Sequence, residues 1–185
     1  FKELEHDYGT LGDQERLVGI RSQQGLLYAE MGEYERALPL MIQAEQLYRS
    51  QQKEGLLAWI QIEIATILLN QNKVVEAVSK LQQADAILRG GESSDSVTLG
   101  HWQLVMGMAE AAQSNPTKAL YYLAQAEPIF VKEKNQRFLA RVYEVRARIL
   151  EQQGQINGAL ASLKKYVETK HSLERVLREQ RSLQM

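Results

Sequence analysis

Cysteine is absent from the 185-residue chain, which excludes disulfide bonds and thiolate metal sites. An excess of one charge is also lacking, because 22 basic residues stand against 23 acidic ones and the net charge is −1. That balance gives no electrostatic basis for binding nucleic acid or an anionic membrane surface. No apolar run is long enough to cross a bilayer, so we expect no membrane span within the chain.

Catalytic and cofactor motifs are lacking as well. The three histidines, His6, His101 and His171, lie far apart in the sequence. There is no metalloprotease motif, glycine-rich phosphate loop, nucleophile elbow or calcium-loop array of carboxylates. The many Glu, Gln and Lys residues follow a helical spacing that is typical of solvated helix faces. We therefore expect no catalytic, cofactor-binding or metal site in this segment, and no enzyme activity of its own.

An internal repeat is the strongest feature that the sequence does contain. Four stretches share a helix-like run, a short polar turn and an alanine early in a second run: residues 27–48, 67–88, 108–130 and 149–168. The alanines recur at intervals of about forty positions, and they are Ala37, Ala77, Ala119 and Ala159. A repeat of this length indicates helix pairs that stack on one another.

Further small residues recur at fixed places in these units. One lies in the first helix of each unit, and another follows the repeat alanine by seven positions in all but the fourth, which has Tyr166: Gly25, Ala65, Gly107, Ala147, Ala44, Ala84 and Ala126. Two antiparallel helices approach closely only where their side chains are small. Because one pair cannot bury its apolar faces alone, we expect the pairs to stack and to share a core.

The first unit has the sequence MGEYERA at its turn and resembles the tetratricopeptide repeat. The matching residues are Gly25, Tyr28, Gly32, Tyr34, Ala37 and Ala44. The fourth unit keeps the turn glycine in QGQINGA, whereas Asn72 and Ser114 replace it in the second and third. The period exceeds the usual thirty-four positions, which indicates longer helices or loops. The resemblance implies an all-α, right-handed α-solenoid of about four helix pairs plus a long C-terminal extension helix.

We expect a single tetratricopeptide-like domain over residues 1–185. Its repeats are predicted at residues 14–50, 54–89, 96–132 and 136–170, with the extension helix at 171–185. Residues 59–69 (WIQIEIATILL) begin with an alternation of apolar and polar residues, which is a strand-like pattern. Four repeats in register outweigh so short an alternation. The segment is therefore predicted to be the first helix of the second pair, apolar nearly all round.

In tetratricopeptide arrays the first helix of each pair lines a concave surface that binds an extended peptide or a partner helix, so the resemblance implies such a groove. On this chain the groove is predicted to be apolar in the middle and charged in the fourth pair. Its candidate residues are Leu26, Trp59, Ile62, Leu69, His101, Leu104, Val105, Met108, Arg141 and Arg148. Such a surface would suit an apolar segment that carries an acidic group.

Each groove assignment has a structural alternative. The apolar candidates belong to the core if the pairs pack more tightly. His101 is then a structural residue near the start of a helix. Arg141 and Arg148 lie seven positions apart on one helix face, and each could pair with a neighbouring glutamate instead of a ligand.

The last helix is predicted to be longer than a helix pair requires. Residues 164–185 contain neither glycine nor proline, and the helix is expected to start near Ile156 and to run to Met185. Apolar residues follow one another at heptad-like intervals: Tyr166, Leu173, Val176, Leu177 and Leu183. This stripe predicts a dimerising or output helix. The alternative is a cap that solvates the end of the solenoid.

The segment from Ala159 to Met185 also resembles the exit helix of tetratricopeptide sensor regions in bacterial signalling proteins. Those regions precede GGDEF diguanylate cyclase domains or histidine kinases. The resemblance implies a non-catalytic sensory module of a larger protein that binds a protein, a peptide or a small ligand. It leaves open the cytoplasmic and the periplasmic side of the cell. A homodimer through the last helix is one expected arrangement.

Two other functions fit the same sequence. A free-standing assembly scaffold predicts a natural chain that ends close to Met185. A peptide-pheromone receptor predicts a short peptide in the groove, held by Trp59 and Met108.

Overall fold

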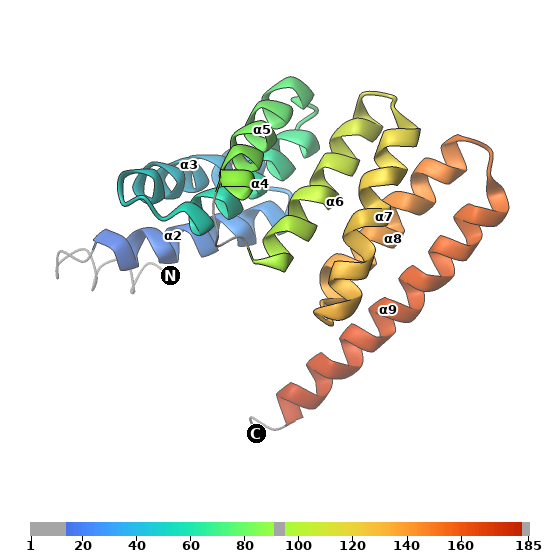
Figure 1. The fold of residues 1–185 in the computed structure, drawn as a ribbon. Helices are drawn as coiled ribbons and strands as arrows, with labels where there is room; N and C mark the ends of the chain where they lie inside the picture. Colours follow the sequence, from blue (N-terminus) through green and yellow to red (C-terminus); the bar gives the residue numbers. More distant parts are fainter. Residues whose placement is uncertain (1–13, 91–94, 183–185) are drawn as a thin grey trace. The chain divides into compact units, whose positions relative to one another are not determined.

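The computed structural model describes residues 14–90 and 95–182, and every regular element within them is a helix (Figure 1). These helices are α2 (Gln14–Glu30), α3 (Tyr34–Ser50), α4 (Glu54–Asn70), α5 (Val74–Gly90), α6 (Ser96–Ala112), α7 (Pro116–Lys132), α8 (Gln136–Gln152) and α9 (Ile156–Ser182). Each helix from α2 to α8 has 17 residues, whereas α9 has 27. The predicted all-α solenoid of helix pairs with a long last helix is confirmed.

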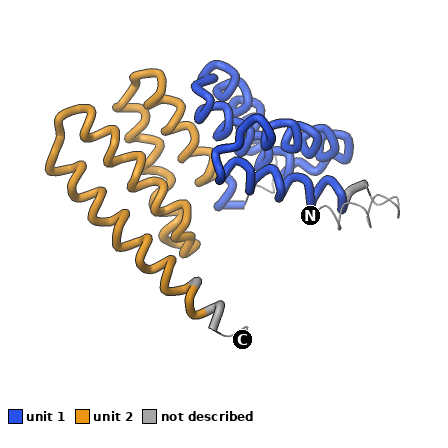
Figure 2. Tube along the Cα trace, turned by 180° about the vertical axis from the view of Figure 1, so that it is seen from behind, with its two compact units in different colours: residues 1–98 blue, residues 99–185 orange. Residues whose placement is uncertain are grey.

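The chain forms two compact units, residues 1–98 and residues 99–185 (Figure 2). In unit 1, α2 pairs with α3 and α4 with α5, and α3 also packs on α4. In unit 2, α8 pairs with α9 and packs on α7. The first helix of unit 2, α6, meets α7 at Gly107, where a Cβ atom would lie 3.1 Å from Leu123. The assignment of all 185 residues to one domain stays a prediction.

Close helix contacts occur at the predicted small residues. A Cβ atom on Gly25 of α2 would lie 3.3 Å from the Ala37 carbonyl oxygen, and one on Gly107 of α6 would lie 3.1 Å from that of Ala119. The repeat alanines are all buried, as are the alanines that follow them by seven positions in the first three pairs. The helices of a pair therefore pack backbone against side chain, and the larger residues fill the space around these points.

The turn within each pair has one residue with a left-handed backbone. These residues are Gly32, Asn72, Ser114 and Gly154, with φ between 61° and 77°. In each turn the next amide donates to a carbonyl five positions before it, as Lys73 does to Leu68 at 2.8 Å. The turn geometry is thus the same in all four pairs, including the two without glycine. Asparagine tolerates this conformation better than serine does.

Residues 59–69, whose sequence begins like a strand, lie in α4. This helix is buried on most sides, with Ile60, Gln61, Ile62, Ile64 and Ala65 among its buried residues. Consecutive residues are buried because both α3 and α5 pack on α4. The helical prediction for this segment is confirmed, and the periodicity is weak because so few of its sides face solvent.

Candidate functional site

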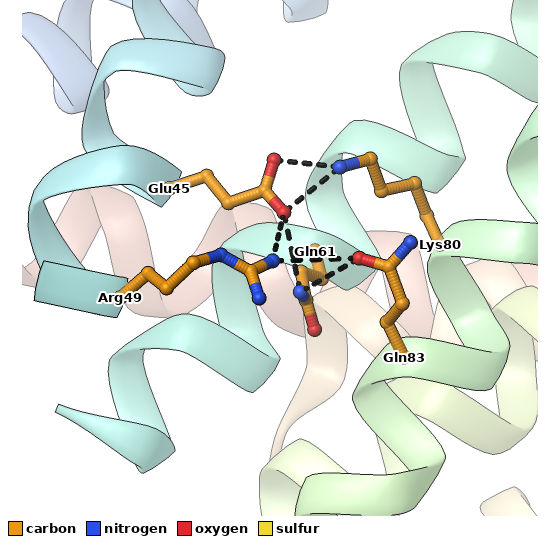
Figure 3. Close-up of polar contacts among 5 residues, drawn as sticks. All are labelled: Glu45, Arg49, Gln61, Lys80 and Gln83. Carbon is orange, nitrogen blue, oxygen red and sulfur yellow. Dashed lines mark hydrogen bonds and ion pairs between the residues drawn. The ribbon is translucent and has the colours of Figure 1, made fainter. Parts of the chain in front are cut away.

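Glu45 on α3 is buried, and side chains from three helices surround it (Figure 3). Lys80 on α5 donates to both carboxylate oxygens, at 2.7 and 2.8 Å. Arg49 of α3 and the amide of Gln61 on α4 donate to Oε1, at 3.0 and 3.2 Å. Gln61 also donates to Oε1 of Gln83 on α5 at 3.2 Å. These five residues, the Glu45 cluster, connect α3, α4 and α5.

Two opposing effects act on the pKa of Glu45. Burial is the larger single effect and raises the pKa, because desolvation disfavours the charged carboxylate. The hydrogen bonds from Lys80, Gln61 and Arg49, together with the charge of Lys80, outweigh burial and leave the pKa below its ordinary value. Glu45 is therefore ionised at neutral pH.

Glu127 on α7 occupies the equivalent place in unit 2, two helix pairs after Glu45. Its Oε2 accepts from Arg146 at 2.6 Å, and its Oε1 accepts from the Tyr143 hydroxyl at 2.9 Å and from Lys165 at 3.3 Å. Tyr143 and Arg146 lie on α8 and Lys165 on α9. We call these four residues the Glu127 cluster.

Burial and hydrogen bonding also act in opposite directions on the pKa of Glu127. Burial is the largest single effect and raises the pKa of Glu127. The hydrogen bonds from Arg146 and Tyr143, with the charge of Arg146, together outweigh burial and leave the pKa below its ordinary value. Burial, with the bond to Glu127, raises the pKa of Tyr143 to about 12. A general base that works near neutral pH needs a pKa close to that pH. Neither carboxylate meets this condition. The hydrogen bonds of each cluster join three helices.

Sequence reasoning missed both clusters. The available signal is an acidic residue eight positions after the repeat alanine in the first three pairs, Glu45, Asp85 and Glu127, and it does not tell which of the three gathers donors from the next pair. The donors are scattered over the following pair as Gln, Lys, Tyr and Arg. Only a superposition of the chain on itself with a shift of two pairs would align Gln61 with Tyr143 and Gln83 with Lys165.

In unit 1 the predicted groove residues lie on α2 and α4. Ile62 is fully buried, and so it presents little side chain to a partner. Leu26, Trp59 and Leu69 are half-buried. Along α4, Trp59, Glu63, Thr66 and Leu69 form the face that keeps partial exposure.

In unit 2 the predicted groove residues on α6 are mostly buried. Leu104 and Val105 lie in the core, and Met108 is half-buried. His101 is buried and stacks on Phe138 of α8 with 4.5 Å between the ring centroids, and Phe138 stacks in turn on Phe130 of α7. Burial, followed by the positive charge of Arg137, lowers the pKa of His101 to about 3. His101 is therefore neutral and part of the packing.

The charged groove residues on α8 share one acidic partner. Arg141 lies 2.7 Å from Oε2 of Glu144, and Arg148 lies 3.3 Å from its Oε1. All three side chains are at least partly exposed. Pairing with a neighbouring glutamate, the structural alternative from the sequence, is what the geometry shows. Whether a ligand also binds these arginines stays a prediction.

The predicted dimer or output stripe lies on α9. Tyr166 and Leu173 are half-buried along the row of buried Ala159, Ser162 and Thr169, and Val176 is exposed. The side chain of Leu177 and the whole of Leu183 lie outside the described residues. The role of this stripe in pairing stays a prediction.

Residues 14–90 and 95–182 contain neither a metal-binding cluster nor a membrane-spanning helix. No group of three or more His, Cys, Asp or Glu side chains in these ranges is arranged to hold a metal ion. Among the same residues, no helix has both the length and the apolar character that a membrane crossing requires.

Comparison with known proteins supports the fold. Neither a protein-family model nor a curated protein matches the chain. BtubC (BKLC) from P. vanneervenii is similar, with a TM-score of 0.62 and 16% identity over 85% of this chain; the chain spans 65% of the length of BtubC. MamA, solved as the RS-1 ArsTM double mutant, is similar over 93% of both chains, with a TM-score of 0.53 and 12% identity. These similarities, together with the helix pairs described above, support a tetratricopeptide-like, all-α solenoid fold for the chain.

Proposed function

We propose that this chain is a non-catalytic protein-binding module that takes up an extended peptide or a partner helix on the first helices of its pairs. The partly exposed face of α4 carries the proposal. Most side chains of α4 are buried, yet Trp59, Glu63, Thr66 and Leu69 stay half-exposed along one face, at spacings of four, three and three positions. Such a row is the pattern on which one side of a partner can lie.

The chemistry of this face suits a protein partner. A tryptophan that is only half-buried is a frequent anchor in protein interfaces, because a large flat ring loses little conformational freedom on binding. The Thr66 hydroxyl donates to the Ile62 carbonyl at 3.0 Å within its own helix. A partner at this position therefore meets mainly the Thr66 methyl group, between Trp59 and Leu69.

The equivalent face of α8 has a different character. Arg141 and Arg148 stand at the positions that Trp59 and Thr66 occupy in unit 1, and they pair with Glu144. An acidic group on a ligand would compete with Glu144 for these arginines. We therefore propose that the α4 face makes apolar contacts and that the α8 face selects acidic groups.

Selection of peptides from a random library displayed on phage, against the immobilised chain, tests the binding function. Trp59→Ala should weaken the selected peptides by about tenfold or more, as expected for a buried aromatic anchor. Thr66→Arg should have a similar effect by crowding the face without disturbing the core. Circular dichroism and the urea midpoint establish that each variant remains folded.

Tyr121 provides the matched control. It is an exposed aromatic residue on α7, the second helix of its pair. Tyr121→Ala should leave the affinity unchanged. If the selected peptides bind the Trp59→Ala and Thr66→Arg variants with unchanged affinity, α4 is not part of the binding site.

We further propose that the module is the sensory region of a larger bacterial signalling protein, such as a diguanylate cyclase. Its support is the length of α9, which is well over that of every other described helix and could transmit a change to a following domain. The sequence of the intact protein beyond residue 185 tests this. A GGDEF or kinase domain there would support the sensory function, and a chain that stops within a few residues would favour the assembly scaffold.

A further inference from the structure

A row of apolar side chains on α9 is exposed. Ile156, Leu160, Leu163 and Val167 are 62%, 65%, 46% and 47% exposed. Their spacings of four, three and four positions place them on one helix face, in the pattern of a coiled-coil seam. We call this row the α9 seam. It lies away from the row with Ala159, Ser162 and Thr169, which are buried, and α9 packs on α8.

The same repeat positions are covered elsewhere in the chain. Four positions after the repeat alanine, Met41 of α3 and Leu123 of α7 are fully buried, whereas Leu163 is not. Eight positions after it, Glu45 and Glu127 are held by the first helix of the next pair, whereas Val167 is exposed. In α3 and α7, therefore, the residue eight positions after the alanine lies at an interface with the helix that follows. Met41 and Leu123 also lie near the glycine of the helix before, Gly25 or Gly107. The α9 seam is the equivalent face of α9. Among the described residues no helix covers it, and Leu163 and Val167 are exposed.

The course of α9 argues against a further pair of the same kind as its cover. Helices α3, α5 and α7 end after 17 residues. Short turns follow α3 and α7 and bring the next helix back along them. α9 instead continues straight through the equivalent place, from Leu173 to Ser182. A turn at the usual position is thus absent from this described part of the chain. A second copy of the chain can reach the α9 seam without one.

The residues that extend the seam set the orientation of such a copy. Lys170 and Glu174 follow Val167 at the next two seam positions. In a parallel, in-register pair each would lie opposite its own copy, and like charges there are unfavourable. An antiparallel pair that places Ile156 opposite Val167, and Leu160 opposite Leu163, brings only apolar residues together. This arrangement is isologous, with the same surface on both copies.

We propose that the chain forms an antiparallel homodimer through the α9 seam. This surface is distinct from the proposed peptide-binding face of α4 and from the stripe of Tyr166, Leu173 and Val176. Dimerisation would present two α4 faces to a partner, so a ligand with two copies of a binding segment would gain effective concentration.

The oligomeric state of the chain and of two charge variants tests the proposal. Sedimentation equilibrium of the 185-residue chain should show a dimer that dissociates on dilution. Leu160→Glu should shift it to a monomer, because a carboxylate would be buried in the seam. Tyr121→Glu is the matched control, since Tyr121 is 61% exposed, close to the 65% of Leu160, and should leave the dimer intact. Circular dichroism checks that both variants are folded.

Cysteine cross-linking tests the orientation, because the chain has no cysteine of its own. A mixture of an Ile156→Cys chain and a tagged Val167→Cys chain should give a mixed disulfide on oxidation, with little of either homodisulfide. Predominant homodisulfides would mean a parallel pair and overturn the antiparallel arrangement. A chain that is monomeric at every concentration would overturn the dimer. A dimer lost in Val176→Glu but retained in Leu160→Glu would overturn the assignment to the α9 seam.

Discussion

Each unit holds an acidic residue at the same repeat position, Glu45 or Glu127, but surrounds it differently. Glu45 is held by one lysine, one arginine and an amide, and Glu127 by an arginine, a tyrosine hydroxyl and a lysine. In both units the carboxylate is on the second helix of a pair, and the following pair supplies donors. The comparison shows that an acid held by the following pair recurs two pairs apart with different partners, whereas Asp85 at the same position of the second pair bonds to Arg89 of its own helix.

The units differ more in how far their last pair is covered. Leu81 in unit 1 and Leu163 in unit 2 stand four positions after their repeat alanines, and only Leu163 is exposed. Leucines at equivalent repeat positions therefore have different surroundings, one in the core and one on the surface. Four predictions use differences of this kind, from the largest expected effect to the smallest.

Truncation of the two leucines should separate core from surface most strongly. Leu81→Ala should lower the free energy of unfolding by about 3–4 kcal/mol, because it leaves a cavity in a packed core. Leu163→Ala should cost about 1 kcal/mol or less, since roughly half of its surface is already in water. Urea denaturation of the two variants at a low protein concentration measures both values. Equal losses in the two variants would show that the α9 seam is covered in solution even at a low protein concentration.

Acid should act on unit 2 through His101. Its pKa is about 3 when folded and near 6.5 when unfolded, so the unfolded chain binds more protons between these values. The stability that neutral His101 contributes is complete above pH 6.5 and falls by about 1.4 kcal/mol per pH unit below it, or about 2–3 kcal/mol at pH 4.5. His101→Phe should keep the stack on Phe138 and abolish this loss.

Hydrogen exchange of peptides from each unit at pH 7 and pH 4.5 measures that effect. Corrected for the intrinsic exchange rate, protection should fall mainly in peptides of unit 2, and His101→Phe should restore it. A loss of protection that is equal in the two units, and unchanged in the variant, would contradict the assignment to His101.

Neutralisation of the two carboxylates should distinguish the clusters by burial. Glu45→Gln should cost about 2 kcal/mol, since it removes charged hydrogen bonds from a side chain only 7% exposed. Glu127→Gln should cost about 1 kcal/mol, because Glu127 is more exposed and water replaces part of the lost interaction.

Thermal unfolding at pH 7 and at pH 3 tests this. The folded pKa values of both acids are lowered, so the stability they contribute is present above the unfolded pKa and disappears as the pH falls through the folded one. The difference between wild type and each Gln variant should therefore shrink at pH 3. A difference that persists there would indicate lost packing rather than lost charge.

Helix capping should give the smallest contrast. Asn135 precedes α8 and its side chain accepts from the Phe138 amide at 3.2 Å, whereas Lys53 precedes α4, two pairs earlier, with no such bond. The backbone is nearly the same at both, with φ of −84° in each case. Asn135→Ala should cost about 1 kcal/mol and Lys53→Ala close to zero, as measured by urea midpoints. A loss at Lys53 as large as that at Asn135 would contradict capping as the cause.

The fold could be predicted from the sequence because the repeated small residues mark the places where helix backbones come close together. Small residues such as Ala37 and Gly107 are required wherever helices touch, so their spacing predicts the pairs, and even the strand-like start of α4 was assigned correctly. The start of α9 at Ile156 followed from the same register.

The surfaces were harder to predict, because burial depends on neighbours far apart in the chain. Ile62 and Val105 were placed in the groove but lie in the core. The stripe chosen on α9 from heptad spacing includes the half-buried Tyr166, while the exposed row at Leu160 was overlooked. Spacing alone identifies which residues share a face, and only packing shows which face is covered.

The placement of the acidic residues also bears on how such a gene could change in length. The donors to Glu45 and to Glu127 come largely from the pair that follows, and the second and fourth pairs have Asp85 and Val167 at that position. A duplication or deletion of the first and second pairs together, or of the third and fourth together, would carry an acid with its donors and leave the other cluster complete. Loss of the second or the fourth pair alone would separate a carboxylate from its donors and expose the product to purifying selection. Lineages of this chain should therefore differ in length by two pairs at a time.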